Sequence, residues 1–576
     1  MEEIRIGVYI CWCGSNIAKM IDVQHIAGEA KKLPDVVIAR DYKYMCSDPG
    51  QDTLISDIKE NRLNRIVIAA CSPRIHEPTF RKALEQAGMN PYLFQMANIR
   101  EQDSWVHIDR EYASLKALSL IKAAVNRVRF HKPLEKRFVD VNSATLVIGG
   151  GIAGISAALE IADAGKQVYL IEKLDSLGGI TAQIDLTFPY LASANQMLRP
   201  KIHQVQAHKL IDVFLKTTVK DITGYVGNFT SKLQVDGKEK EIQFGNIIIA
   251  TGLQPFNPTV IPEYQFGKLP DIITSLQLEK ILKKGKIVTS SGKEPGNIAI
   301  IHCVGSRNSK YRPYCSRTCC STALKYANQL QSALPGSNIY ELYADMRTFG
   351  KGCEEFYAES SRKKIMFLMF DQEKDLPVIR KAEEHDSAEM IITMHEKLSG
   401  EDIEIPADLV ILMTGMEAQS DAKETARIAG ISLCGNDFYI EKHPKLDPVA
   451  TTTDGVYIVG SCQSPKDIPE SITQAKAAAA RVLASIAVGS KEVEVTTAHV
   501  DENVCCGCQT CIMVCPYKAI SFNEEKKVSV VNEALCKGCG TCGSTCPTGA
   551  IESRHFTDTQ ILSQIEGLLK TEKEPI

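Results

Sequence analysis

The stretch LVIGGGIAGISAALEIADAGKQVYLIEK, residues 146–173, decides the fold of this chain. A short apolar run leads into glycines in the G-x-G-x-x-G register, then a helical run, then a second apolar run that ends in an acid. In a strand–turn–helix, such glycines allow a tight turn and the close approach of a pyrophosphate, which the helix N-terminus binds. The alternative is a glycine-rich turn without a ligand. We predict a dinucleotide site formed by Gly149, Gly151, Ile152, Ala153, Gly154 and Lys173, with Glu172 placed to reach a ribose hydroxyl.

Composition narrows the class of protein. The 576 residues allow about three domains with ample core, and the formal net charge of −4 does not favour nucleic acid or a membrane surface. No apolar run reaches about 18 residues, so we expect a cytoplasmic protein with no membrane span. The 20 cysteines are bunched at short spacings. In a large chain without a secretion signal, such bunching is more typical of metal ligands than of disulfides.

Residues 1–140 are predicted to form a small α/β domain. Short β-branched runs at 6–10, 36–39 and 66–69 are separated by helix-like segments, and cysteines follow each run. Ligands in open α/β sheets gather at the carboxyl ends of parallel strands, so these thiols could hold one iron–sulfur cluster. The alternative is a set of unrelated buried cysteines. The four thiols are Cys11, Cys13, Cys46 and Cys71.

Residues 141–495 are predicted to form an FAD-binding domain of the two-dinucleotide, thioredoxin-reductase-like type. After the first glycine turn come a second glycine pair, a buried strand ending in Ala-Thr-Gly, a strand VYIVG and a strongly helical run. In such flavoproteins the last helix points its positive end at the flavin. The further cofactor contacts expected are Gly179, Ala250, Thr251, Gly252, Gly460, Ser461 and Ile468.

The second half of this domain departs from the two-dinucleotide pattern. The strand at 298–302 has no glycine turn after it, and four cysteines occur within 18 residues instead. We interpret them as ligands of a [4Fe–4S] cluster that replaces the nicotinamide site, with incidental thiols as the alternative. Adjacent cysteines cannot both face one cluster from a strand, so we expect the last pair in a turn ahead of a helix over 321–333. The four are Cys303, Cys315, Cys319 and Cys320.

Residues 496–576 contain the most specific pattern. Two C-x2-C-x2-C-x3-C-P runs follow each other, which is the bacterial ferredoxin arrangement for two [4Fe–4S] clusters. The fourth cysteine of each run is expected to ligate the other cluster. One set is therefore Cys505, Cys508, Cys511 and Cys546, and the other is Cys536, Cys539, Cys542 and Cys515.

At this point the chain resembles the A subunit of heterodisulfide reductase over nearly its whole length. The match is carried by Cys11–Gly14, Tyr44–Gln51, Cys71–Phe80, Asn90–Glu101, the glycine turn, Thr187–Pro189, Gly224–Thr230, Cys303–Cys320, Cys462–Ala475 and the two ferredoxin runs. The resemblance implies an FAD and iron–sulfur subunit with a homodimeric core in a larger complex. It also implies that Lys325 lies by flavin N5, the alternative being a solvated lysine on a helix face.

The partners are likewise implied by the resemblance alone. They are B and C subunits (HdrB- and HdrC-like), a small iron–sulfur adaptor joined to a hydrogenase, formate dehydrogenase or NADH-linked module, and ferredoxin. The flavin of the family can bifurcate electrons between ferredoxin and the B and C subunits. A non-bifurcating electron-relay and assembly subunit is the alternative function, and a free-standing NADH-dependent reductase is disfavoured by the missing second glycine turn.

Two departures from the family concern cluster number. Longer members insert a further ferredoxin domain after Gly224–Thr230, whereas here Ser231–Phe244 runs straight on to the next strand, which makes this chain a short form. Many members also carry a Cys-Ser-x-Cys stretch where this chain has Tyr190–Met197. The ligation of the N-terminal cluster is altered here if those cysteines serve it.

Overall fold

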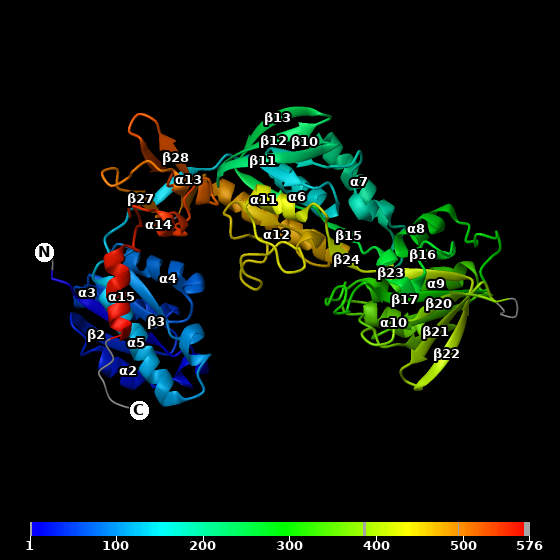
Figure 1. Ribbon diagram of the computed structural model, residues 1–576, viewed down its shortest axis with the longest axis horizontal. Helices are drawn as coiled ribbons and strands as arrows, with labels where there is room; N and C mark the ends of the chain where they lie inside the picture. Colours follow the sequence, from blue (N-terminus) through cyan, green and yellow to red (C-terminus); the bar gives the residue numbers. More distant parts are fainter. Residues whose placement is uncertain (1–2, 384–387, 494, 570–576) are drawn as a thin grey trace. The chain divides into compact units, whose positions relative to one another are not determined.

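The computed structural model describes residues 3–383, 388–493 and 495–569 and divides into two compact units. One unit combines Met1–Phe138 with Glu492–Ile576, so residues of the first and third expected domains share it. The other unit is Val139–Lys491. The chain passes between the units within strands β5 (Arg137–Asp140) and β26 (Ser490–Val493) (Figure 1).

The first unit begins with a four-stranded parallel sheet in the order β2-β1-β3-β4. Its two central strands, β1 and β3, are mostly aliphatic and almost wholly buried, which is typical of parallel strands covered on both faces. Helices cover the two faces, and a single π-helical turn, η1 (Arg100–Ser104), follows the last strand. The elements are β1 (Ile6–Cys11), α1 (Ser15–Ala18), α2 (Val23–Ala30), β2 (Val36–Tyr42), α3 (Asp48–Glu60), β3 (Arg65–Ala70), α4 (Pro73–Gln86), β4 (Phe94–Asn98) and α5 (Arg110–Val128).

The carboxyl-terminal part of this unit is a small domain with two pairs of antiparallel strands, followed by a helix. Its two short helices each begin beside a cysteine run, and the final helix packs against α5. The elements are β27 (Ala498–Val500), α13 (Thr510–Val514), β28 (Ile520–Asn523), β29 (Val528–Val531), α14 (Thr541–Thr545), β30 (Ile551–Ser553) and α15 (Asp558–Leu569). Strand β27 pairs antiparallel with β30, and β28 pairs antiparallel with β29.

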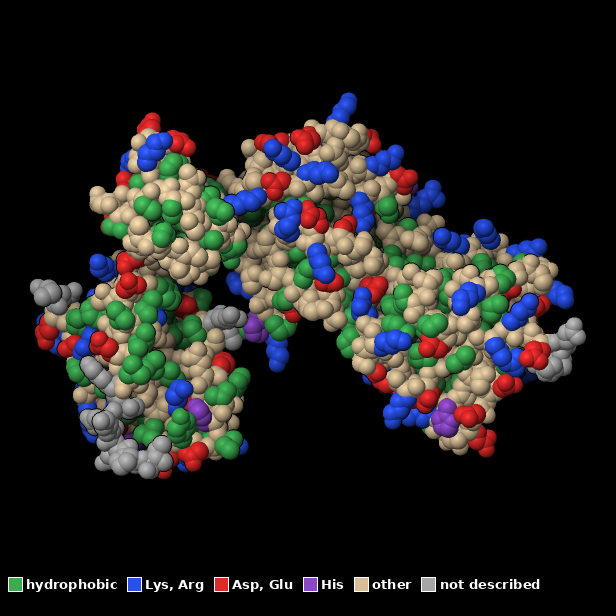
Figure 2. Space-filling model, in the orientation of Figure 1, with side chains coloured by type: hydrophobic (Ala, Val, Ile, Leu, Met, Phe, Trp, Pro, Cys, Tyr) green, Lys and Arg blue, Asp and Glu red, His purple; other side chains and the backbone are tan. Residues whose placement is uncertain are grey.

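Helix α15 packs on α5 through its polar and small residues. Arg127 donates hydrogen bonds to Gln564 and to the backbone oxygen of His555, at 2.8 and 2.7 Å. A Cβ at Gly567 would lie 2.6 Å from the Cα of Ala123, so only glycine allows this close approach of the two helices. The aliphatic side chains of α15 are exposed instead, and Figure 2 shows hydrophobic side chains gathered over this helix.

The second unit contains two five-stranded parallel sheets. The first has the order β10-β7-β6-β14-β25, and α6 and α12 pack together against it. Its elements are β6 (Thr145–Ile148), α6 (Ile152–Asp163), β7 (Val168–Ile171), α7 (Ala194–Ala207), β10 (Ile211–Phe214), β14 (Asn246–Ile249), β25 (Val456–Ile458) and α12 (Ile468–Val488). An antiparallel sheet of β11 (Thr217–Tyr225), β12 (Asn228–Val235) and β13 (Lys238–Phe244) adjoins it, and β12 turns directly into β13 at Asp236-Gly237.

The second parallel sheet has the order β16-β23-β17-β18-β19 and a three-stranded antiparallel sheet, β20-β21-β22, beside it. The central strand β17 (Asn297–Val304) is buried along almost its whole length. Its helices are α8 (Ser275–Lys284), α9 (Cys319–Ala333) and α10 (Cys353–Ser360), and its other strands are β16 (Ile272–Thr274), β18 (Asn338–Tyr343), β19 (Ile365–Met369), β20 (Val378–Lys381), β21 (Met390–Glu396), β22 (Glu401–Ala407) and β23 (Leu409–Thr414). The unit therefore has two α/β halves, each built around a parallel sheet.

Candidate functional site: a nucleotide turn and four sets of thiols

The three glycines of the first turn meet different surroundings. Gly149 has a φ of 112°, and a Cβ there would lie 2.3 Å from the backbone oxygen of Ala250. A Cβ at Gly154 would lie 1.9 Å from the oxygen of Gly149, whereas a Cβ at Gly151 would have nothing within 4 Å. Gly149 and Gly154 are therefore required by packing within the turn. Gly151 faces open space at the N-terminus of α6, which fits a bound pyrophosphate.

The acid at the end of β7 is held by the turn itself. Glu172 is buried, and its carboxylate accepts hydrogen bonds from the backbone N–H groups of Gly150 and Leu174, at 2.7 and 2.8 Å. Lys173 points elsewhere, because its Nζ lies 3.0 Å from the carboxylate of Asp421. The structure thus brings Glu172, but not the charged end of Lys173, to the glycine turn.

The other expected cofactor contacts lie at the carboxyl edge of the same sheet. Ala250, Thr251 and Gly252 directly follow β14, and Gly460 and Ser461 follow β25. Gly460 has a φ of 74° and donates its N–H to the side chain of Gln474, at 2.7 Å. In open α/β sheets this edge is where ligands bind, so the arrangement fits a dinucleotide.

Two further positions complete this edge. Gly179 lies against Gly151, since a Cβ on it would be 3.2 Å from the Gly151 Cα. Ile468 is the first residue of α12, which Asp467 and Glu470 begin with a capping box. A helix N-terminus carries a partial positive charge, so α12 can stabilise a negatively charged part of a bound cofactor.

The four thiols of the second half gather at the carboxyl end of β17. Cys303 is the last residue but one of β17 and has a φ of 55°, and Cys319 and Cys320 begin α9. Burial raises the pKa of Cys303 to about 12, and the charges of Cys320 and Cys315 add to that shift. Burial likewise raises the pKa of Cys319, with contributions from the other three thiols. Four thiolates so close together repel each other, and binding to a cluster of metal ions relieves this repulsion.

The position of the adjacent pair differs from the sequence expectation. A turn ahead of the helix is expected for Cys319 and Cys320, but both residues form the first turn of α9. Successive residues of a helix are about 100° apart, which brings both side chains toward one side more easily than a strand would. The unsatisfied N–H groups at the helix start also favour thiolates.

Positive side chains surround these thiols. The guanidinium of Arg307 contacts Cys303 and is paired with Asp345, and Arg347 contacts Cys315. His302 is fully buried beside Glu341. Burial lowers the pKa of His302, but the charge of Glu341 together with the contacts with Cys320 and Glu341 outweighs burial and raises this pKa to about 10. Burial alone would raise the pKa of Cys320, but the hydrogen-bonding contact with His302 lowers it.

Lys325 lies about one and a half turns beyond the thiols on the same helix. It is only 2% exposed, which excludes the alternative of a solvated lysine. Its Nζ pairs with Glu279 of α8 and donates to the backbone oxygen of Leu186, the latter at 2.9 Å. Tyr326 donates to the same carboxylate, at 2.8 Å. Burial lowers the pKa of Lys325, and the charge of Glu279 opposes that shift.

The four N-terminal thiols also lie close together. Cys11 ends β1, Cys13 follows with a φ of 50°, Cys46 follows β2, and Cys71 follows β3. Burial raises the pKa of Cys71 to about 12 and also raises the pKa of Cys11 and Cys46, with the charge of Cys13 contributing each time. The donor set is four thiols at one sheet edge, of which Cys11 and Cys71 are buried and Cys13 and Cys46 are half-buried. Such a set fits an iron–sulfur cluster.

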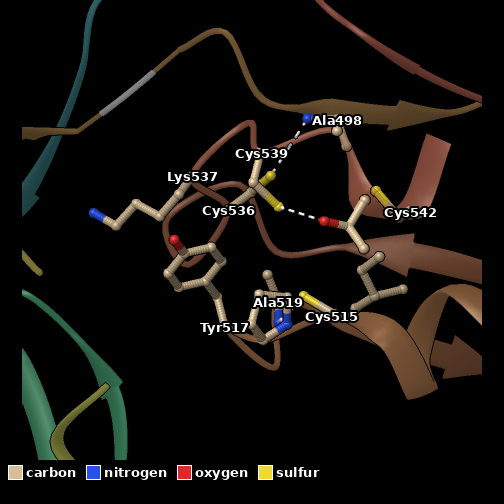
Figure 3. Close-up of a pocket in the computed structure, with 12 residues that line it drawn as sticks. Ala498, Cys515, Tyr517, Ala519, Cys536, Lys537, Cys539 and Cys542 are labelled. Carbon is tan, nitrogen blue, oxygen red and sulfur yellow. Dashed lines mark hydrogen bonds between the residues drawn. The ribbon is translucent and has the colours of Figure 1, made fainter. Parts of the chain in front are cut away.

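The ferredoxin-type cysteines line two separate cavities. Cys515 lines one cavity together with Cys536, Cys539 and Cys542, and Figure 3 shows these four thiols around it. Backbone N–H groups of Ala519 and Ala498 donate to Cys515 and Cys536, both at 3.3 Å. The other cavity is lined by Cys505, Cys508, Cys511 and Cys546, together with the exposed Cys506. Each cavity therefore combines three cysteines of one run with the fourth of the other, and it fits one four-iron cluster.

Two results concern absences within the described residues. No group of three or more His, Cys, Asp or Glu side chains there converges tightly enough to hold a single metal ion. In the same part of the chain, no helix is both long enough and apolar enough to cross a membrane.

Two family models agree with this geometry. Residues 143–292 match the family model of the pyridine nucleotide-disulphide oxidoreductases, and residues 498–553 match that of the 4Fe-4S dicluster domain. Among solved structures, the thioredoxin reductase of T. acidophilum is 16% identical and has a TM-score of 0.42, over 60% of this chain and 99% of that one. The fold and the thiol sets define an oxidoreductase of the iron–sulfur flavoprotein class.

Comparison with curated proteins identifies the family. The chain is 40% identical to the A subunit of the H(2):CoB-CoM heterodisulfide,ferredoxin reductase of Methanothermobacter marburgensis, over 99% of this chain and 98% of that protein. It is 41% identical to an iron-sulfur A subunit of the CoB–CoM heterodisulfide reductase of Methanopyrus kandleri, over 99% of each. The chain belongs to the family of heterodisulfide reductase A subunits. The first alignment runs over 653 positions against 576 residues here, so at least 77 positions face gaps in this shorter chain.

Sequence reasoning missed the charged residues around the thiols and the lysine. Glu279 is 46 positions from Lys325, and Glu341 is 39 positions from His302, so only the fold brings each pair together. Arg100 contacts Cys13 from 87 positions away. The one signal in the sequence is that Arg100 lies inside the Asn90–Glu101 segment that resembles the family.

Proposed function

We propose that this chain is the FAD- and iron–sulfur-containing electron-transfer subunit of a heterodisulfide-reductase-like complex, and that it bifurcates electrons. Its partners in this proposal are a two-electron donor module, ferredoxin, and B- and C-type subunits that reduce a disulfide or another acceptor. The names of the relatives support this assignment, because they combine a heterodisulfide with hydrogen, formate or ferredoxin. A flavin exchanges electrons in pairs, and iron–sulfur clusters exchange them singly.

Helix α9 is the observation that carries the proposal. Its first turn holds Cys319 and Cys320, and Lys325 lies on the same helix about 9 Å further along its axis. Lys325 also bonds to Leu186, which closely follows the Gly178-Gly179 turn of the nucleotide half. One rigid element therefore joins the nucleotide side of the unit to a set of thiols.

The residues of this region hold and orient the cofactors. Gly151 and the N-terminus of α6 would hold the pyrophosphate, and the N-terminus of α12 would stabilise negative charge on the cofactor. Glu279 holds the ammonium of Lys325 in one position. In the proposal, Lys325 can donate a proton or a hydrogen bond at flavin N5, and a lowered pKa makes proton transfer from it easier.

Cofactor content is the first test. The chain made under anaerobic conditions should contain one FAD and about sixteen irons, four for each of four clusters. About twelve iron atoms per chain would contradict the N-terminal cluster. About eight iron atoms per chain would also contradict the cluster of the α9 region.

The acceptor requirement is the second test. With the donor and acceptor subunits added, bifurcation requires that ferredoxin reduction stop when the disulfide-type acceptor is left out. If ferredoxin is reduced at the same rate without that acceptor, the chain is a non-bifurcating electron relay. One observation supports the non-bifurcating alternative. The alignment leaves at least 77 positions of gaps in this chain, and a shorter chain has fewer places for clusters.

A further inference from the structure

Arg100 lies among the four N-terminal thiols. It begins the π-helical turn η1 directly after β4, and its Nη1 donates a hydrogen bond to the Sγ of Cys13, at 3.2 Å. Its positive charge also acts on Cys46 and Cys71, where it opposes the burial that raises the pKa of both thiols. A single π-helical turn is uncommon and is often found at functional sites.

Two neighbours fix the direction of this guanidinium. Glu101 accepts hydrogen bonds from its Nε and Nη2, at 3.2 and 2.7 Å. The ring of Trp105 stacks against it, 4.7 Å from centroid to Cζ. Because Nε and Nη2 are bonded to the carboxylate, the rigid fork of the arginine leaves Nη1 directed at the thiol.

An arginine here has a defined effect on a cluster. A cluster with four thiolate ligands is negatively charged, and its reduction potential depends on net charge and on hydrogen bonds to the sulfurs. Arginine stays protonated in proteins, so Arg100 supplies both a donor and a permanent positive charge. Both effects stabilise the reduced cluster, which is the more negative form.

We propose that Arg100 is a positioning residue that hydrogen-bonds Cys13 and raises the reduction potential of a [4Fe–4S] cluster bound by Cys11, Cys13, Cys46 and Cys71. The inference rests on the N-terminal cluster of the proposed function. It adds that this cluster accepts electrons more readily than its thiol ligands alone would allow.

The test is a potentiometric titration of the full chain, followed by electron paramagnetic resonance. The signal of the N-terminal cluster is the one that a Cys71→Ser variant lacks, and the two ferredoxin clusters of the same molecule serve as internal references. Arg100→Met should shift the N-terminal potential downward relative to these references. Arg100→Lys keeps a positive charge but loses the fork geometry, so its shift should be smaller.

Arg81 provides a matched control in the same domain. It pairs with Glu77, at 2.6 Å, and stacks on Tyr92, at 4.4 Å, so it shares the salt bridge and the ring contact of Arg100. Its contacts in the described residues include no thiol. Arg81→Met should therefore leave the potential unchanged.

Each outcome of the titration decides the proposal. An unchanged potential in Arg100→Met, or an equal shift in Arg81→Met, overturns it. If Arg100→Met binds no N-terminal cluster, Arg100→Lys carries the test: a downward shift supports the proposal, whereas an unchanged potential or a lost cluster overturns it. An iron content near twelve atoms per unmodified chain would contradict the N-terminal cluster itself. The iron content tests whether the cluster exists, whereas the potential tests the role of Arg100.

Discussion

Gly151 and Gly154 are three residues apart in one turn, but they are required for different reasons. A side chain at Gly154 would collide with the backbone of Gly149, and one at Gly151 would enter open space. Gly151→Val should therefore fold and lose FAD, because its side chain occupies the place of the pyrophosphate. Gly154→Val should unfold at a lower temperature. Flavin absorbance and thermal unfolding separate the two effects, and a Gly151→Val protein with unchanged FAD affinity would place the cofactor elsewhere.

Asp103 is a buried carboxyl group whose stability effect depends on pH. It lies in η1, and neither carboxylate oxygen has a hydrogen-bond partner among the described residues. Burial raises its pKa from 3.8 to about 7. The folded domain therefore binds more protons than the unfolded chain between these values, and its stability falls as the pH rises through this range.

Asp103→Asn should remove this dependence. The variant should match the unmodified chain near pH 4 and exceed it near pH 8, with a difference that grows by at most about 1.4 kcal/mol per pH unit in between. Hydrogen exchange in α5 and β4 measures the local stability. Glu111→Gln, at the exposed start of α5, is the control, and equal pH profiles for all three proteins would contradict the prediction.

At the scale of an element, helix α9 carries both the thiol pair Cys319 and Cys320 and the buried Lys325. Changing Cys319 to Ala should remove about four of sixteen irons and leave FAD and the ferredoxin clusters in place. Reduced flavin should then fill the ferredoxin clusters more slowly, because an intermediate acceptor is missing. Stopped-flow absorbance can measure this rate, and an unchanged rate would mean that the cluster is structural.

Cys353 is a suitable control for that experiment. It is buried at the start of α10 and is not among the four thiols at the end of β17. A Cys353→Ala variant should keep its iron content and its rate of electron transfer. If it loses four irons as well, Cys353 belongs to the ligand set and the assignment of Cys315, Cys319 and Cys320 must change.

At the scale of the whole molecule, the absence of a second glycine turn limits the donor. Strand β17 contains Cys303 near its end and is followed by a loop that contains Cys315, where a nicotinamide site would need glycines. The isolated chain should therefore not oxidise NADH or NADPH at a useful rate. Anaerobic mixing with each nucleotide tests this, with dithionite as the control that the flavin can be reduced. Rapid flavin bleaching by NADH alone would contradict the prediction.

The sequence predicted most reliably the sites in which one residue type recurs at a fixed spacing. The glycine register and the two cysteine runs predicted a flavoprotein with a ferredoxin domain, and the matching family models confirm both. The pairing of Cys515 with the second run could be expected because the pattern implies it. These features are local, so short segments contain the whole signal.

The features that the sequence did not predict depend on contacts between residues far apart in the chain. Strand β4 was not predicted, because Phe94–Asn98 mixes polar and apolar residues without a clear alternation. The pairs Lys325–Glu279 and His302–Glu341 join different elements of the sheet region, and no spacing rule indicates them. Helix α9 begins at Cys319 after Thr318, whose side chain makes no capping hydrogen bond, and the sequence did not predict this start.

The packing of α15 on α5 has a consequence for synthesis of the chain. Val128, at the end of α5, and Asp558, at the start of α15, are 430 positions apart, and the entire flavin unit is translated between them. At about 5–20 residues per second, a ribosome needs roughly 20 to 90 s for that stretch. The face of α5 around Ala123 and Arg127 is therefore exposed to solvent on the nascent chain. Helix α15 can pack on it only after both ferredoxin runs have left the ribosome.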